Sequence, residues 1–171
     1  MKKMKVLICL LSLGLAVSAQ TQRKITKSSV SFRIKNAGSW VDGTFGKVSG
    51  TVKFDEKAAN NSIDASVDAN SVSTKNDMRD KHLKKDDFFD VEKIPLIKIT
   101  SQKITHKDAE NYEGEFKVTI KNTTKNMNIP FTFKNGVFSA SFNINRQDFN
   151  VGGGTLILSE IAYVVVVFAT E

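Results

Sequence analysis

The chain has 171 residues, a single cysteine and a formal net charge of +7. One cysteine excludes an intramolecular disulfide, and the length suits about one domain with a substantial core. The lysines are interspersed with acidic residues rather than grouped in runs, which is typical of a solvated exterior and disfavours a nucleic-acid partner.

Residues 1–19 predict an export signal. Three lysines precede the apolar run 6–17, and Val17-Ser18-Ala19 forms a small-residue cleavage site. The run is shorter than the roughly 20 residues of a spanning helix, so we expect removal of the signal and no stable membrane span. The mature domain, residues 20–171, is then periplasmic or secreted and carries no cysteine.

Most of the mature chain alternates apolar and polar residues with period two, which predicts half-buried strands. The segments concerned are 28–35, 40–54, 63–70, 97–104, 116–121, 127–133, 138–145 and 161–169. The apolar parity of the second segment switches near Gly46, which predicts a bend or bulge there. Pro130 must lie where no ladder donor is needed, and Asn135-Gly136 is typical of a hairpin turn. His106 is expected in a polar turn and residues 146–154 in a flexible, glycine-rich connection.

Residues 76–90 form the only long segment that does not alternate, and they predict a short helix and loop at one barrel end. Met78, Leu83, Phe88 and Phe89 are expected on its inner side. Its five aspartates and His82 could ligate a metal, but their spacing fits no known site and lysines lie between them. No Gly-x-Ser-x-Gly elbow occurs either. We therefore predict no metal, no cofactor and no catalytic residue.

About eight strands with short turns predict an all-β, closed antiparallel barrel with one short helix or loop insertion near residues 75–90. The interior of such a barrel is either packed or holds one small ligand, and the pattern alone favours packing. The last segment is different, because residues 164–168 are apolar on both faces. That segment needs an outer cover, which makes a homodimer possible.

Several motifs at fixed spacing give the chain a resemblance to a known family. They are Val30-Ser31-Phe32-Arg33-Ile34-Lys35, Val41-Asp42-Gly43-Thr44-Phe45, Ser71 with Thr74, Arg79-Asp80-Lys81-His82-Leu83, Asp87-Phe88-Phe89-Asp90, and Ile144-Asn145-Arg146-Gln147-Asp148-Phe149. Over nearly the whole mature chain it resembles the YceI-like family of exported, lipocalin-like polyisoprenoid-binding proteins. The family's usual glycine after the last motif is Asn150 here, and its histidine before the first glycine is Ala37.

The resemblance implies a barrel that holds an isoprenoid chain, such as a polyprenyl phosphate or isoprenoid quinone, as carrier, store or scavenger. The residues expected to line the apolar tunnel are Phe32, Ile34, Trp40, Phe45, Phe54, Val67, Phe88, Phe89, Ile99, Phe116, Val118, Phe131, Phe133, Phe138 and Phe142. Arg79, His82 and Arg146 are the expected partners of a polar headgroup at the mouth. The alternative is a protein-interaction module with a packed barrel and a partner-binding or dimerising C-terminal strand.

Overall fold

The structure is a computed structural model that describes residues 22–55 and 60–171. These residues form the strands β1 (Gln22–Asn36), β2 (Ser39–Phe45), β3 (Val48–Lys53), β4 (Ser62–Asp68), β5 (Leu96–Asp108), β6 (Asn111–Ile120), β7 (Thr123–Lys134), β8 (Val137–Asn145) and β9 (Leu158–Thr170). The α-helix is α1 (Asp77–Leu83), and two 3₁₀ turns are η1 (Ala69–Ser71) and η2 (Arg146–Phe149). The predicted export signal, residues 1–19, lies outside the described residues.

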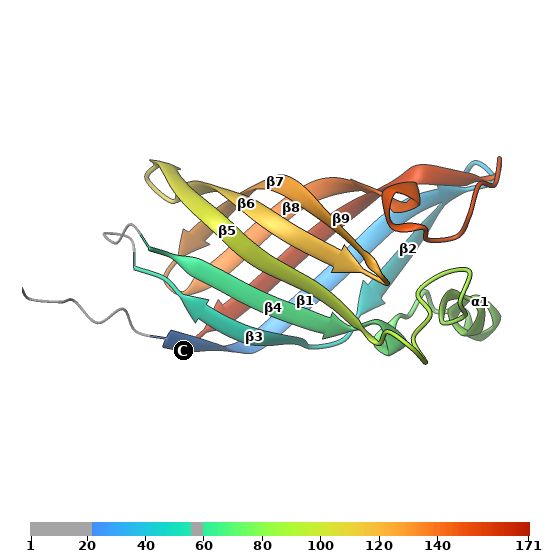
Figure 1. Cartoon of the computed structure of the whole chain (residues 1–171), viewed down its shortest axis with the longest axis horizontal. Helices are drawn as coiled ribbons and strands as arrows, with labels where there is room; N and C mark the ends of the chain where they lie inside the picture. Colours follow the sequence, from blue (N-terminus) through green and yellow to red (C-terminus); the bar gives the residue numbers. More distant parts are fainter. Residues whose placement is uncertain (1–21, 56–59) are drawn as a thin grey trace, which may run out of the picture.

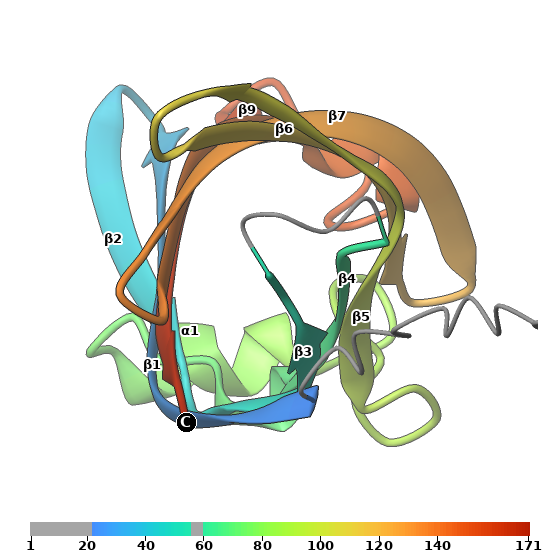
Figure 2. The same ribbon diagram turned by 90° about the vertical axis from the view of Figure 1, so that its left-hand side faces the viewer.

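The strands close into a barrel, because β1 pairs with β9 from Ile25 to Asn36 (Figure 2). On its other edge β1 pairs with β3 through Gln22–Lys24 and with β2 through Val30–Asn36, so β2 and β3 act as one bent barrel strand. Every pairing is antiparallel, and the result is an eight-strand closed barrel with one helix. The predicted fold class is confirmed, and so is the bend at Gly46, which lies between β2 and β3.

The barrel is split along part of the junction between β7 and β8. These strands pair only through Phe131–Lys134 and Val137–Ala140, so Pro130 lies just beyond the paired stretch. The expectation that the missing donor of Pro130 faces no ladder is therefore confirmed. The segment after β8 packs beside β7, where Phe149 and Val151 are buried. These two side chains help to close the split.

Aromatic side chains pack together at the barrel end that holds the C terminus. Figure 1 shows this end of the barrel on the left. Phe54 lies 4.1 Å from Phe133 and 4.9 Å from Tyr112 between ring centroids, and Phe131 lies 4.8 Å from Phe138. Phe54, Phe131 and Phe133 are buried but line no cavity, contrary to their predicted role as tunnel residues. They occur at strand ends that converge there, so they pack against one another. This end of the barrel is a packed core, as the pattern alone favoured.

One residue differs from its predicted position, and two residues at turns have a positive φ. His106 lies in β5 rather than in a turn, and its ring stacks on Tyr112 at 4.8 Å. Ala37 has a positive φ of 48° in the turn between β1 and β2, and Asn150 has a φ of 55° at the end of η2. Asparagine tolerates this region better than other non-glycine residues, so Asn150 suits this position.

Candidate functional site

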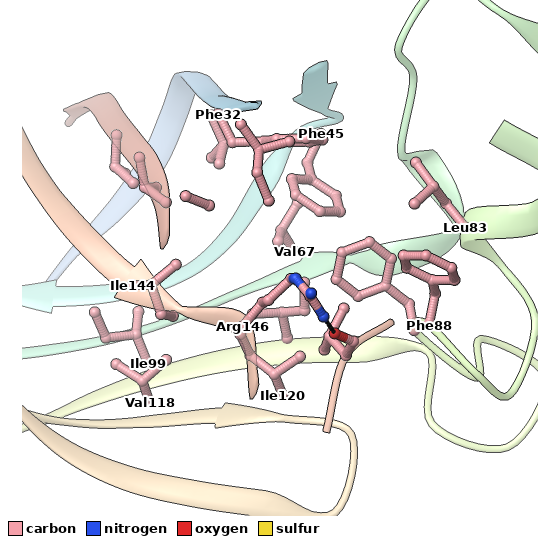
Figure 3. A pocket seen from close by; sticks show the side chains of 18 of the residues that line it. Phe32, Phe45, Val67, Leu83, Phe88, Ile99, Val118, Ile120, Ile144 and Arg146 are labelled. Atoms are coloured by element: carbon pink, nitrogen blue, oxygen red, sulfur yellow. Dashed lines mark hydrogen bonds between the residues drawn. The ribbon is translucent and has the colours of Figure 1, made fainter. Parts of the chain in front are cut away.

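An apolar cavity of about 540 Å³ occupies the barrel half next to α1. Ligand sites are commonly about 300–1,000 Å³ in volume. Most of its wall consists of aliphatic and aromatic side chains from the inner faces of the strands (Figure 3). Its polar members, apart from Ser66 and Lys98, come from the mouth; they are Asn36, Thr74, Arg79, His82, Asp87, Arg146 and Thr155. The barrel is therefore packed at one end and hollow at the other.

Most of the residues predicted for the tunnel line this cavity. They are Phe32, Ile34, Phe45, Val67, Phe88, Phe89, Ile99, Phe116, Val118, Phe138 and Phe142. Except for Phe88 and Phe89, which lie between β4 and β5, their shared position follows from the period of two, because alternate residues of a strand point to the same face. Whether they contact a ligand stays a prediction.

Trp40 does not line the cavity, contrary to the prediction. Its side chain lies on the outer face, 46% exposed, with its ring 5.6 Å from that of Tyr163 on β9. The reason is the same alternation: Val41 takes the inward position, so its neighbour must point outward.

Residues 77–90, termed the lid, cover one side of the mouth. Leu83, Phe88 and Phe89 line the cavity, and the ring of Phe89 lies 5.5 Å from that of Phe45 in an edge-on contact. Met78 is 84% exposed, so its predicted inner position is wrong. The predicted helix itself is confirmed as α1, and its inner side is carried by the turn that follows it.

The lid is also joined to the loop after η2. The Gly152 amide donates to the Asp87 carbonyl at 2.7 Å, and the Lys121 ammonium donates to the carbonyls of Asp86 and Asn150. Gly152 has a φ of 74°, and a Cβ at this position would lie 2.6 Å from the Phe88 ring. Glycine is therefore required for the close contact between the loop and the lid.

A polar cluster anchors α1 to the barrel. The buried Thr74 receives a bond from Arg79 Nε at 2.7 Å, and its own hydroxyl and amide donate to Asp80 Oδ1 at 2.5 and 2.8 Å. The backbone of Ser73 pairs with that of Thr44 on β2. Arg79 was predicted to meet a headgroup; its guanidinium lines the cavity but is already bonded to Thr74.

The pKa of Asp80 is lowered from its usual 3.8. Burial acts in the opposite direction, but hydrogen bonds from Thr74 and Ser73 and the charge of Arg79 together outweigh it. A lowered folded-state pKa means that ionised Asp80 stabilises the fold above the unfolded pKa, and this stability is lost as pH falls through the lower folded value.

Asp80→Asn should therefore lower the free energy of unfolding at pH 7 and flatten its fall below pH 3.8. Urea unfolding across a pH series measures both effects. Asp86→Asn is the matched control, since the Asp86 side chain is exposed and only its carbonyl is bonded. Parallel pH curves for Asp80→Asn and the unchanged protein would contradict this role.

Arg146 lines the cavity wall but directs its guanidinium into the loop that follows it. The group donates to four carbonyls, those of Ser159 (2.8 Å), Val151 (2.7 Å), Gly153 (2.6 Å) and Leu158 (3.0 Å). The residue is 5% exposed, and no carboxylate in the described parts of the chain lies within ion-pair distance. Burial lowers its pKa, against the opposing charge of Glu160. Arg146 therefore holds the loop in place, and residues 146–154 are not the flexible connection that was expected.

His82 lies at the rim of the mouth, with Nε2 2.7 Å from Asp87 Oδ2 and its ring 5.0 Å from that of Phe88. In residues 22–55 and 60–171, no three His, Cys, Asp or Glu side chains gather in a way that could hold a metal. The same residues contain no helix that is long and apolar enough to cross a membrane.

Sequence reasoning missed part of the wall. Val41, Ile63, Ile97, Ile129, Ala140, Ile144, Val164 and Val166 also line the cavity, and alternation could have identified them. Val151, Gly152, Ile157 and Leu158 line it too. Most of these lie in the loop, where no periodic pattern exists to predict a direction.

The cavity accounts for only one of the two apolar faces of the C-terminal strand, β9. Val164, Val166 and Phe168 line the cavity, whereas Tyr163 and Val165 are exposed on the outer face. The outer residues next to Val165 on the paired strands are Ser31 and Ser141, which are small and uncharged. A homodimer through this face stays a prediction.

Comparison with known proteins agrees with this architecture. The sequence profile of the YceI-like domain matches residues 22–168. The UPF0312 protein YE1254 of Yersinia enterocolitica is 34% identical over 154 residues, which cover 81% of this chain and 79% of that protein. Protein YceI of Salmonella arizonae is 32% identical over 158 residues, covering 83% and 81% of the two chains.

Solved structures share the fold. Burkholderia cenocepacia BcnA superposes with a TM-score of 0.78 at 29% identity, over 84% of this chain and 96% of BcnA. A polyisoprenoid binding domain from Saccharophagus degradans gives a TM-score of 0.67 at 14% identity, over 90% and 99%. The second likeness concerns the fold alone. With the profile match and the curated relatives, these findings show that the chain belongs to the YceI-like domain family.

Proposed function

We propose that this protein binds an isoprenoid lipid, holding the apolar chain inside the barrel and the polar end at the mouth. The observation that carries the proposal is the apolar cavity of about 540 Å³ closed at one end by aromatic residues. Burial of apolar surface contributes roughly 25 cal/mol per Å², so an isoprenoid tail can bind tightly without any reacting group. The fold relative from Saccharophagus degradans, a polyisoprenoid binding domain, supports this ligand class.

The role we infer is that of an exported carrier, store or scavenger rather than an enzyme. The predicted signal in residues 1–19 supports a periplasmic or secreted location. His82 lies at the mouth, where a phosphate or quinone headgroup would be placed, whereas the Asp87 carboxylate would repel a phosphate. Arg146 and Arg79 contribute positive charge near this region, although Arg146 already makes four hydrogen bonds to the protein and Arg79 makes two.

The test is mass spectrometry of an organic extract of the purified protein. We expect a prenylated lipid in the extract, or uptake of an added prenylated quinone by stripped protein. Recovery of no lipid together with no uptake would overturn the proposal.

Filling the cavity should abolish this binding. Ala140 lies on β8 with its methyl group facing the cavity, so an indole at this position would occupy ligand space. Ala140→Trp should weaken quinone binding about tenfold or more, because each excluded methylene of ligand loses roughly 0.8 kcal/mol. Fluorescence titration with the quinone measures the affinity.

Ser141→Trp, one residue along the strand on the outer face, is the matched control and should bind as the unchanged protein does. A second filling variant from another strand, Ala65→Phe on β4, guards against a folding defect at one site. Full lipid content in both filling variants would show that the ligand lies elsewhere.

A further inference from the structure

Exposed apolar side chains gather at one corner of the mouth. Six of the nine exposed large apolar residues of the described chain belong to β2, β9 or the loop before β9: Trp40, Leu156, Ile157, Ile161, Tyr163 and Val165. The Ala37 amide donates to the Ile157 carbonyl at 2.7 Å, so this loop lies beside the turn between β1 and β2. The docking corner is defined here as residues 35–40 and 155–163.

The tip of the docking corner projects into solvent. Leu156 is fully exposed and Ile157 is 63% exposed. A Cβ at Gly153 or Gly154 would have no atom within 4 Å, so the loop before Leu156 faces open space on that side. A projecting pair of aliphatic side chains suits insertion into a soft apolar medium better than packing on a flat protein surface.

Aromatic and cationic groups lie behind this tip. The ring of Trp40 lies 5.6 Å from that of Tyr163, and the Lys35 ammonium and Arg33 guanidinium lie 5.0 and 5.5 Å from the Trp40 ring centroid. Arg33 is paired with Asp42, whereas Lys35 has no carboxylate within ion-pair distance in the described residues. Tryptophan and tyrosine favour the headgroup level of a bilayer, and lysine favours its anionic phosphates.

The same corner is continuous with the cavity. Ile157 is exposed on the outside and also lines the cavity. Its neighbours Thr155 and Leu158 line the cavity as well. An apolar chain that leaves the cavity at this point would pass from protein to the exposed tip rather than into water. Exposure of such a chain to water costs free energy in proportion to its apolar area, so a path between cavity and bilayer lowers the barrier to exchange.

We propose that the docking corner binds the surface of a lipid bilayer, with Leu156 and Ile157 in the headgroup–acyl boundary and Trp40 and Tyr163 at headgroup level. The partner is a bilayer that contains anionic phospholipid, since Lys35 faces it. Glu160 is the only acidic residue of the stretch 155–163 and is exposed on it, which limits the electrostatic attraction. The use of the surface for lipid exchange rests on the proposed function, but the docking itself does not.

The test is co-sedimentation of the full chain with vesicles of mixed phosphatidylcholine and phosphatidylglycerol. Leu156→Asp should reduce binding about tenfold or more, because a leucine that inserts into the bilayer is replaced by a charged side chain. Lys35→Glu should reduce binding to the mixed vesicles while leaving binding to pure phosphatidylcholine unchanged. Val137→Asp is the matched control, since Val137 is an exposed aliphatic residue at the opposite barrel end and should have no effect.

Absence of vesicle binding by the unchanged protein would overturn the inference, as would equal losses in Leu156→Asp and Val137→Asp. Sedimentation of the protein without vesicles tests the main alternative occupant of the docking corner, which is a second copy of the chain. If Leu156→Asp turns a dimer into a monomer and vesicles bind neither form, the corner is a contact between copies. Lipid extraction from Leu156→Asp separates the two proposals. If this variant keeps its lipid but no longer binds vesicles, both proposals are supported. If the unchanged protein contains lipid but does not bind vesicles, only the proposed function is supported.

Discussion

Replacing Arg146 by methionine should lower the free energy of unfolding by about 3 kcal/mol, the largest stability effect that we expect from a single side chain. Methionine keeps much of the apolar stem but leaves the carbonyls of Val151, Gly153, Leu158 and Ser159 without the donors that now bond them. Charged hydrogen bonds contribute about 1.5–3 kcal/mol each, and partial access of water to the loop offsets part of the total loss. Urea unfolding of the full chain measures the change.

Two companion variants show whether geometry or charge is responsible. Arg146→Lys keeps the charge but loses the planar fork, so it should recover less than half of the lost stability. Arg79→Met removes bonds to a single residue, Thr74, at a more exposed position and should cost only about 1 kcal/mol. If Arg146→Met unfolds like the unchanged protein but loses bound lipid, the residue serves a headgroup and the interpretation as a loop clamp is wrong.

Arg146 also shows where sequence reasoning reaches its limit. The resemblance to the YceI-like family implies Arg146 as a partner of a polar headgroup, a role that suits a side chain with five donors and a permanent charge. The partners turned out to be main-chain carbonyls of a loop that follows it by 5–13 residues. No pattern of side chains in the sequence predicts such hydrogen bonds, since every residue carries a carbonyl. The same holds for Thr74, whose motif position is explained by contacts with Arg79 and Asp80 rather than with a ligand.

The strands were predictable for the opposite reason. A closed barrel requires one inner and one outer face, so period two defines each strand and the side chains that face inward. The parity change at Gly46 marked the bend between β2 and β3 correctly. The period does not indicate how deep along the barrel axis each side chain lies. Phe54 and Phe45 both face inward from the same bent strand, yet Phe54 fills the closed end and Phe45 lines the cavity.

The depth of each side chain is decided by strand tilt and register. Phe138 on β8 lies opposite Phe168 on β9, and their rings stack 4.5 Å apart where the cavity gives way to the packed end. Register of this kind depends on turn geometry and on long-range pairing, which a single sequence does not display. The choice between a filled barrel and a hollow one therefore needed the structure.

The lid was predictable in part: its helix and the inward position of Phe88 and Phe89 follow from the sequence, whereas the partners of each ring do not. Phe88 packs on Gly152 and lies 5.0 Å from His82, and Phe89 reaches Phe45 on the barrel wall. Phe45 in turn lies 5.5 Å from Phe32. The lid is thus held to the mouth by the contact of Phe89 with Phe45, by the polar cluster around Thr74 and by hydrogen bonds from Gly152 and Lys121.

Replacing Phe88 and Phe89 together by alanine should speed release of a bound prenylated quinone about tenfold or more. Each ring now covers part of the cavity and would leave an opening in the mouth, and a lost aromatic contact contributes about 0.5–1.5 kcal/mol beyond its buried area. Stopped-flow transfer of the quinone to acceptor vesicles measures the rate. Met78→Ala is the matched control, because its side chain lies on the same segment but faces solvent.

An independent variant approaches the lid from the other side. Gly152→Ala places a methyl group 2.6 Å from the Phe88 ring at a φ that alanine adopts with strain, so the ring must move. It should speed release in the same direction while leaving both phenylalanines in the chain. If release rate and unfolding free energy both stay unchanged in the double alanine variant, the lid does not close the cavity. If Gly152→Ala alone has no effect, the loop after η2 does not position Phe88.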